Sequence, residues 1–214
     1  MLSGLIVGCA SVGTDVSSTP QLNPRIVLVD LYHGSLDGNL KAMIEKGGYT
    51  TVPCDAPLTD QALQSAGTLW IDDNASRDYQ PGEIKAVRRF VQLGGTVICS
   101  GQAWSWAYDK KDISRYPLNQ LGKSLGFMIT GQNIGSPVNK ELSTYLLGVD
   151  TVTRTDWWPS MVESHVRGSR PLIRDENLKT MAIFIPRGSG RIFIFGHGSI
   201  LKENPQILLN ILGG

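Results

Sequence analysis

Apolar and polar positions follow two different periods along this chain. The continuous apolar run at residues 26–31 has the length of a strand that is buried on both faces of a sheet. Three further strands are predicted over residues 49–52, 68–71 and 96–99. Between them, apolar positions three and four apart predict amphipathic helices. The predicted helices follow Asp37, cover residues 60–65 and 117–126, and begin at Pro81. This alternation predicts a parallel sheet with helices on both faces.

The last third of the chain adds an antiparallel element. Residues 181–185 and 191–195 have the pattern of two strands, and the five residues between them favour a turn. A final helix is predicted over residues 204–212. Residues 131–176 show no regular period apart from a helix-like stretch at residues 141–147. We therefore predict a three-layer α/β sandwich with a mostly parallel central sheet and a C-terminal antiparallel hairpin.

Two glycine pairs, Gly47–Gly48 and Gly94–Gly95, stand where predicted helices should end. Glycine is favoured there because it adopts the left-handed backbone conformation of a helix stop at low cost. We expect Gly95 to adopt that conformation, so that valine at this position would unfold the domain.

Composition and charge exclude several functional classes. The 214 residues are enough for one full-sized core. With 20 basic and 19 acidic side chains and no basic run, a nucleic-acid partner is not expected. No apolar run reaches the roughly 18 residues of a membrane-spanning helix. The three cysteines and three histidines lack zinc-binding spacing, so neither a metal nor another cofactor is expected. A disulfide between Cys54 and Cys99 stays open.

The first 23 residues differ from the rest of the chain. Ile6-Val7-Gly8-Cys9 resembles a bacterial lipobox, in which Cys9 would be acylated, and the polar stretch after it suits a flexible tether. No basic residue precedes the apolar segment, a fault that a start farther upstream would repair. We expect a signal remnant and tether over residues 1–23 and a domain over residues 24–214. Cys9 would anchor the protein in a bacterial cell envelope; a frayed tail and a cytoplasmic location are the alternative.

Two segments resemble a known family. They are Leu93-Gly94-Gly95-Thr96-Val97-Ile98-Cys99-Ser100-Gly101-Gln102-Ala103-Trp104-Ser105-Trp106-Ala107 and Tyr116-Pro117-Leu118-Asn119-Gln120-Leu121-Gly122-Lys123-Ser124-Leu125-Gly126-Phe127. With the order of elements, they resemble the class I glutamine-amidotransferase-like, flavodoxin-like domain found with enhancin-like mucin-degrading peptidases and in channel-associated factors. The resemblance covers residues 24 to 214. The chain has no H-E-x-x-H, so the resemblance does not carry a peptidase activity over.

Several polar residues follow predicted strands and should meet at one edge of the sheet: His33, Asp72, Cys99 and His197. The resemblance to true amidotransferases suggests a thiol-dependent hydrolase or amidotransferase in which Cys99 is the nucleophile and His197 its base. Two departures count against catalysis. Val97 replaces the first glycine of the nucleophile turn, and Gly198–Ser199 replaces the usual Pro-Glu after the histidine.

The other hypothesis is a non-catalytic binding or accessory module of the envelope. Gly101, Gln102, Trp104 and Trp106 would then form a ligand site with His33 and Asp72. In that case the two tryptophans stack on a sugar ring and Gln102 bonds its hydroxyls; alternatively, one tryptophan plugs a gap and Gln102 ties down loop backbone. The pair Trp157–Trp158 is either a contact for a glycan or envelope protein, or a lid over the sheet edge. We expect the binding module and leave enzymatic activity open.

Overall fold

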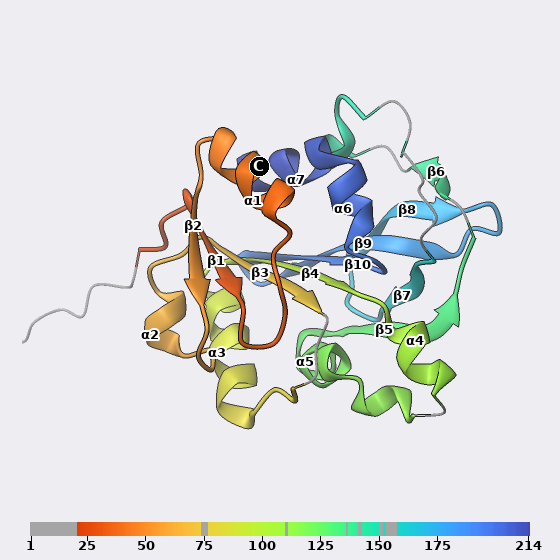
Figure 1. Ribbon diagram of the computed structural model, residues 1–214, viewed down its shortest axis with the longest axis horizontal. Coiled ribbons are helices and arrows are strands. Elements are labelled where there is room, and N and C mark those ends of the chain that lie inside the picture. The colour runs from red at the N-terminus through yellow and green to blue at the C-terminus, as the bar shows by residue number, and fades with distance from the viewer. Residues whose placement is uncertain are drawn as a thin grey trace, which may run out of the picture.

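The computed structural model describes residues 21–73, 77–109, 111–135, 137–140, 143–149, 152 and 158–214. Figure 1 shows a central sheet with helices above and below it. Cys9 and Trp157 lie outside the described residues. The acylation of Cys9 and a contact made by Trp157 therefore stay predictions.

Eight strands form the central sheet, in the order β2-β1-β3-β4-β10-β9-β8-β6. β2, β1, β3, β4 and β10 are parallel, and β9, β8 and β6 continue the sheet antiparallel. The bounds are Ile26–Asp30 (β1), Thr50–Cys54 (β2), Thr68–Asp73 (β3), Thr96–Gly101 (β4), Pro137–Lys140 (β6), Arg170–Asp175 (β8), Thr180–Arg187 (β9) and Gly190–Phe195 (β10). The predicted sheet and its C-terminal hairpin, β9–β10, are confirmed.

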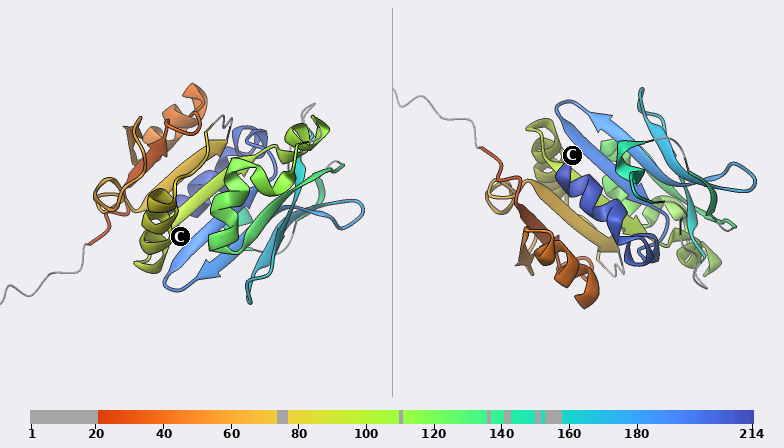
Figure 2. Two further views of the ribbon diagram at one scale, coloured as in Figure 1. Left: turned by 90° about the horizontal axis from the view of Figure 1, so that it is seen from below. Right: turned by 90° about the horizontal axis from the view of Figure 1, so that it is seen from above.

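Helices form the two outer layers. α1, α6 and α7 cover one face, and α2, α3, α4 and α5 lie on the other (Figures 1 and 2). Their bounds are Gly38–Lys46 (α1), Asp60–Leu63 (α2), Pro81–Gln92 (α3), Ala103–Tyr108 (α4), Pro117–Leu125 (α5), Ser199–Glu203 (α6) and Pro205–Gly213 (α7). Alternate residues of each strand enter different cores. Val97 and Cys99 of β4 face α3 and α5, whereas Ile98 faces α1 and α7.

Local sequence signals explain where the helices begin and end. The Asp37 side chain accepts hydrogen bonds from Asn39 N and Leu40 N at the start of α1. α3 begins with Pro81 in its first turn. At its end the left-handed residue is Gly94, with φ of +102°, so the expectation for Gly95 is wrong. A side chain at Gly95 would instead overlap the Phe90 ring.

The segment between α5 and β9 holds most of what the pattern did not predict. β5 (Phe127–Asn133) and β7 (Ser160–Ser164) form a separate two-stranded antiparallel sheet. β6 and β8 extend the edge of the central sheet. The stretch predicted as helical contains only a short 3-10 turn, η2 (Thr144–Leu146), among its described residues. These strands depend on pairing with distant partners rather than on a strong local period.

Three further features concern the end of β4, the course of β2 and the cysteines. The residues after β4 form the helix α4. Pro53 lies inside β2, which is tolerated because β2 is an edge strand. Cys54 and Cys99 are not joined by a disulfide. Among the described residues, no helix has the length and apolarity needed to span a bilayer.

Candidate functional site

A hollow of about 280 Å³ lies where the parallel strands end, beside α1 and α6. Segments at the ends of β1, β3, β4 and β10 all contribute to it, because parallel strands deliver their carboxyl ends to one edge. The lining residues are Ser35, Leu36, Asp37, Leu40, Asp72, Gly101, Gln102, His197, Gly198, Ser199 and Lys202. The hollow is predominantly polar, and it is our candidate site.

Asp72 joins three of these segments. Its backbone oxygen accepts a hydrogen bond from Ser35 N at 3.1 Å, and its Oδ1 accepts one from Ser100 Oγ at 2.5 Å. A Cβ atom on Gly198 would lie 2.7 Å from Oδ1, so the loop after β10 approaches the carboxyl group closely. Burial raises the pKa of Asp72, while the hydrogen bond from Ser100 opposes that rise. The carboxyl group is therefore held in a fixed position against the hollow.

His197 presents a defined tautomer. Its Nδ1 accepts a hydrogen bond from Ser199 N at 3.0 Å. Because Nδ1 is the acceptor, the proton of the neutral ring is on Nε2. Burial also lowers the pKa of His197, which favours the neutral ring at pH 7. His197 is therefore a hydrogen-bond donor through Nε2 at neutral pH.

An ion pair adds charge to the lining. Lys202 Nζ donates to Asp37 Oδ2 at 2.9 Å and joins α6 to the start of α1. The pair lowers the pKa of Asp37 and raises that of Lys202, so both groups stay charged near neutral pH. Both side chains are partly exposed, and their contribution to stability is small for that reason. In the site, Lys202 is a hydrogen-bond donor and Asp37 an acceptor, and the ion pair holds both in position.

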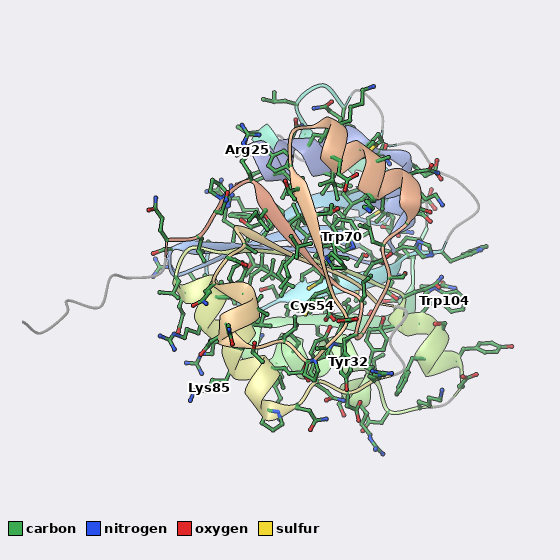
Figure 3. The ribbon with its side chains drawn as sticks, turned by 60° about the vertical axis from the view of Figure 1, so that its left-hand side comes forward. Arg25, Tyr32, Cys54, Trp70, Lys85 and Trp104 are labelled. Atoms are coloured by element: carbon green, nitrogen blue, oxygen red, sulfur yellow. The ribbon has the colours of Figure 1, made fainter. Side chains whose placement is uncertain are left out.

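Aromatic residues adjoin the hollow through Gln102. Gln102 Nε2 donates to the backbone oxygen of Trp158 at 3.3 Å, and Trp104 Nε1 donates to the same oxygen at 2.5 Å. Trp104 N also donates to Ser160 Oγ. Trp158 itself is 52% exposed, and Figure 3 shows Trp104 at the outer edge of the molecule. Gln102 therefore both lines the hollow and helps to hold an exposed tryptophan beside it.

Trp106 does not share this position. Residues two apart on a helix point in different directions, and α4 turns Trp106 toward the core on the α3–α5 side. Its ring lies edge-on to Tyr116, and its Nε1 donates to the oxygen of Asp112. The two tryptophans of this segment thus do not form one stacking platform.

Cys99 lies near the predicted edge of the sheet, but its side chain is on the face opposite the hollow. It is 0% exposed and packs among apolar side chains on the α3–α5 side. Its strand partner in β10 is Ile194, so Cys99 and His197 belong to neighbouring strand ends. Yet His197 lines the hollow on the α1–α6 side of the sheet. A histidine base must contact the thiol it activates, and this placement offers no support for that pairing.

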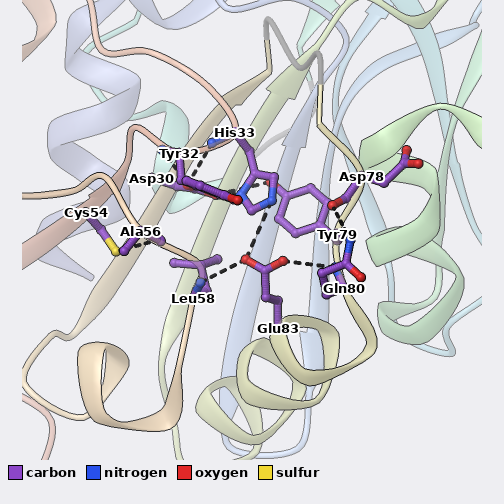
Figure 4. Close-up of polar contacts among 10 residues, drawn as sticks. All are labelled: Asp30, Tyr32, His33, Cys54, Ala56, Leu58, Asp78, Tyr79, Gln80 and Glu83. Carbon is purple, nitrogen blue, oxygen red and sulfur yellow. Dashed lines mark hydrogen bonds and ion pairs between the residues drawn. The ribbon is translucent and has the colours of Figure 1, made fainter.

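His33 also lies on the far side of the sheet from the hollow, in a buried polar cluster (Figure 4). Its Nδ1 is 2.9 Å from Asp30 Oδ2, and its Nε2 is 3.6 Å from Glu83 Oε1. The ring stacks on Tyr79, whose hydroxyl donates to Asp30 Oδ2. With a side chain that is 0% exposed, His33 fixes the loop after β1 rather than facing the hollow.

The hollow therefore brings together four of the site residues predicted from sequence: Asp72, Gly101, Gln102 and His197. Sequence reasoning missed others that line it: Ser35, Asp37, Ser199 and Lys202. The rule that sites lie at strand ends would have found Ser35 and Ser199, since both closely follow strands. Lys202 had no local signal, because its position depends on the packing of α6 against α1.

The lowered pKa of His197 predicts a pH-dependent stability. Because this pKa is lowered from the ordinary value of 6.5, the unfolded chain binds a proton at this residue before the folded chain does. The free energy of unfolding should therefore fall as the pH drops below about 6.5. Urea unfolding at pH 8, 7, 6 and 5 measures this loss. His197→Asn keeps an acceptor for Ser199 N–H, and its stability should fall less over the same range. If the free energy of unfolding of the wild type and of His197→Asn fell equally with pH, His197 would not be the cause of the pH dependence.

Comparison with known proteins extends the description. A family model described as "TRPM8, N-terminal domain" (TCAF_N) matches residues 74–144, which is less than half of the chain. The matched range includes Gly101, Gln102 and Trp104. No curated protein matches the sequence.

Solved structures resemble the chain over most of its length. The N-terminal domain of mmIFT52 has a TM-score of 0.63 at 12% identity, with 86% of this chain and 93% of that chain covered. A Thermoplasma acidophilum protein described as part of a GMP synthase has a TM-score of 0.54 at 8% identity, covering 88% and 92%. A ThuA-like protein from Bacteroides uniformis has a TM-score of 0.53 at 11% identity, covering 92% and 93%. The chain therefore has the glutamine-amidotransferase-like, flavodoxin-like fold, and at such identities the likeness concerns the fold alone.

Proposed function

We propose that this protein is a non-catalytic binding module and that its hollow binds a single unit of a glycan. The observation that carries the proposal is a hollow lined by fixed hydrogen-bonding groups next to an exposed tryptophan. Sites for small ligands combine apolar or aromatic surface with a few well-placed polar groups. A sugar ring offers both hydroxyl groups and an apolar C–H face, so it is complementary to both parts.

The groups in the hollow suit hydroxyl groups in particular. Asp72 supplies an acceptor, the neutral His197 supplies a donor through Nε2, and Gln102 supplies both. Asp37 and Lys202 largely neutralise one another. A neutral ligand with several hydroxyl groups therefore satisfies more of these partners than an ion of either sign.

The same geometry favours binding over chemistry. Cys99 is buried on the other face of the sheet, and Ser100 is 0% exposed with its hydroxyl donated to Asp72. Nδ1 of His197 is occupied by Ser199 N–H and Nε2 carries the proton of the neutral ring. A nucleophile is activated by a base within hydrogen-bonding reach, whereas Ser100 Oγ donates to Asp72 and His197 Nδ1 accepts from the backbone of Ser199 instead.

We also propose that the chain is a diverged copy of the accessory domain found with enhancin-like peptidases and in channel-associated factors. The family model over residues 74–144 supports the relation to channel-associated factors. That range contains the Gly-Gln-Ala-Trp segment and Asn119. Asn119 supports α5 and β5: its side chain exchanges two 2.8 Å hydrogen bonds with the backbone of Ile129. An envelope location and an envelope protein as a second partner stay predictions.

A titration tests the binding proposal. Isothermal titration calorimetry with glucose, galactose, mannose, N-acetylglucosamine and N-acetylgalactosamine should reveal at least one ligand. Asp72→Asn should weaken that binding about tenfold, since one hydrogen bond to a charged group is lost. The variant should stay folded, because an amide still accepts from Ser100 and the raised pKa of Asp72 indicates that a neutral group is tolerated there.

The matched control is Asp60→Asn, which changes an exposed aspartate on α2, on the opposite side of the sheet. It should leave the affinity unchanged. Binding that is equal in both variants would remove the hollow as the site. Failure of all five sugars to bind would overturn the proposal.

A further inference from the structure

Three aromatic residues, Trp158, Trp104 and Tyr108, line up beside the hollow, and we call them the aromatic strip. Trp104 and Tyr108 are four residues apart on α4, so their side chains are neighbours on one side of the helix. The Trp104 indole donates to the backbone oxygen of Trp158, which places Trp158 next in line. Trp158 is 52% exposed and Tyr108 is 82% exposed. Trp104 is partly buried between these two exposed rings in the order of the strip, and exposed apolar surface of this kind marks a contact site.

The strip begins at the rim of the hollow by two independent routes. Gln102 lines the hollow and donates to Trp158 O. Ser160 lies two residues after Trp158, and its backbone N donates to the backbone oxygen of Gly196 at 2.9 Å. Gly196 is followed by His197, which lines the hollow. Gln102 therefore joins the hollow to the strip, and the backbone bond from Ser160 to Gly196 holds the segment after Trp158 beside the loop that carries His197.

Size and charge distinguish the two parts. About 280 Å³ suits one sugar ring and not a chain of them. The Asp37–Lys202 ion pair stands on the α1–α6 side of the hollow, whereas the strip leads away along α4. A longer ligand that places one end in the hollow and extends past Gln102 meets the aromatic rings. Polar Ser105 and Asp109 follow Trp104 and Tyr108 in the sequence, so aromatic and polar side chains alternate here. Such a surface is more complementary to a chain of sugars, which has hydroxyl groups, than to an apolar protein surface.

We infer that the ligand is the end of an oligosaccharide: the terminal sugar occupies the hollow and the following sugars stack on the aromatic strip. The inference rests on the proposed function and specifies its ligand. Aromatic faces bind the C–H faces of sugars by burying apolar area, so each further ring adds affinity. The hollow selects one ring and the strip selects for chain length.

The experiment compares chain lengths by calorimetry. The probes are glucose with malto-oligosaccharides up to maltotetraose, and N-acetylglucosamine with chito-oligosaccharides up to chitotetraose. In one series the affinity should rise at least about tenfold from the monosaccharide to the trimer. Cyclomaltoheptaose, a glucose ring without ends, should bind no better than glucose.

Tyr108→Ala should abolish the gain with length and change the affinity for the monosaccharide less than about twofold. Trp158→Ala should also abolish the gain with length, and it should weaken monosaccharide binding as well, because it removes the aromatic surface beside the hollow. Trp158→Ala retains the backbone oxygen that Gln102 and Trp104 bond, so the hollow stays intact. Leu147→Ala removes another exposed apolar side chain, one that does not line the hollow, and it should leave both affinities unchanged.

Each outcome decides the matter. A gain that is lost in both variants supports the inference. Binding of the monosaccharide without a gain, or equal binding of the cyclic sugar and the linear oligomers, overturns the inference and leaves the proposed function standing. No binding in either series overturns both.

Discussion

Glu83→Ala is expected to lower the free energy of unfolding by about 3 kcal/mol, the scale for losing hydrogen bonds to a carboxylate and leaving a buried donor unsatisfied. Glu83 is 3% exposed. Its Oε1 accepts from Leu58 N at 2.8 Å and its Oε2 accepts from Gln80 N at 2.9 Å. Alanine leaves the buried Leu58 amide without this acceptor and removes a carboxylate 3.6 Å from His33 Nε2. It also removes the negative charge at the start of α3.

Urea unfolding monitored by tryptophan fluorescence measures the change. Glu83→Gln retains one acceptor oxygen and should lose about half as much. Glu45→Ala is the control: Glu45 is an exposed helical glutamate that accepts from Thr51 and lies near Lys41, and its loss should cost less than about 1 kcal/mol. A Glu83→Ala protein as stable as the Glu45→Ala protein would show that the buried cluster does not stabilise the fold.

Glu83 also shows why sequence reasoning stopped short. A glutamate in the first turn after a proline is a local signal, and it predicts the start of α3. That this glutamate is buried depends on Leu58, 25 positions earlier, and on His33 from another strand end. A local pattern holds no information about either partner. The cluster of Figure 4 could not be predicted from the sequence for this reason.

The parallel half of the sheet was predictable because its strands are short segments of strand-forming residues, most of them apolar, and predicted helices separate the first strands from one another. The edge strands β6 and β8 were not, because they are held by pairing across the sheet, with shifts in register. α4 was missed because its six residues are too few to show a helical period. Elements with a strong local pattern could thus be predicted from the sequence, whereas elements that depend on distant partners could not.

For the site, the strand-end rule gave the correct edge but not the face. Side chains alternate along a strand, so Cys99 and Ser100 necessarily point to opposite sides of the sheet. Pairing sets Asp72 beside Ser100, one residue beyond Cys99, and so places the Asp72–Ser100 hydrogen bond on the side of the hollow. The choice between the two faces follows from register, and register is fixed by the whole sheet.

Gly196→Ala is expected to destabilise the fold by about 3 kcal/mol, the upper range for overpacking a tight site. A Cβ atom at Gly196 would overlap the backbone oxygen of Ser160, and backbone cannot move aside as a flexible side chain can. The same two residues are joined by the hydrogen bond from Ser160 N to Gly196 O. Inserting a methyl group therefore forces β10 and the start of β7 apart.

The consequence reaches the site, because His197 follows Gly196 and Trp158 lies two residues before Ser160. We expect Gly196→Ala to weaken sugar binding even at temperatures where the variant is fully folded. Gly82→Ala is the matched control, since a Cβ atom there meets no atom within 4 Å. Within α3 it should stabilise the protein by up to about 1 kcal/mol and leave binding unchanged. If Gly196→Ala binds sugars as the wild type does, the contact between Gly196 and Ser160 does not position the hollow relative to the strip. Hollow and strip would then be independent surfaces.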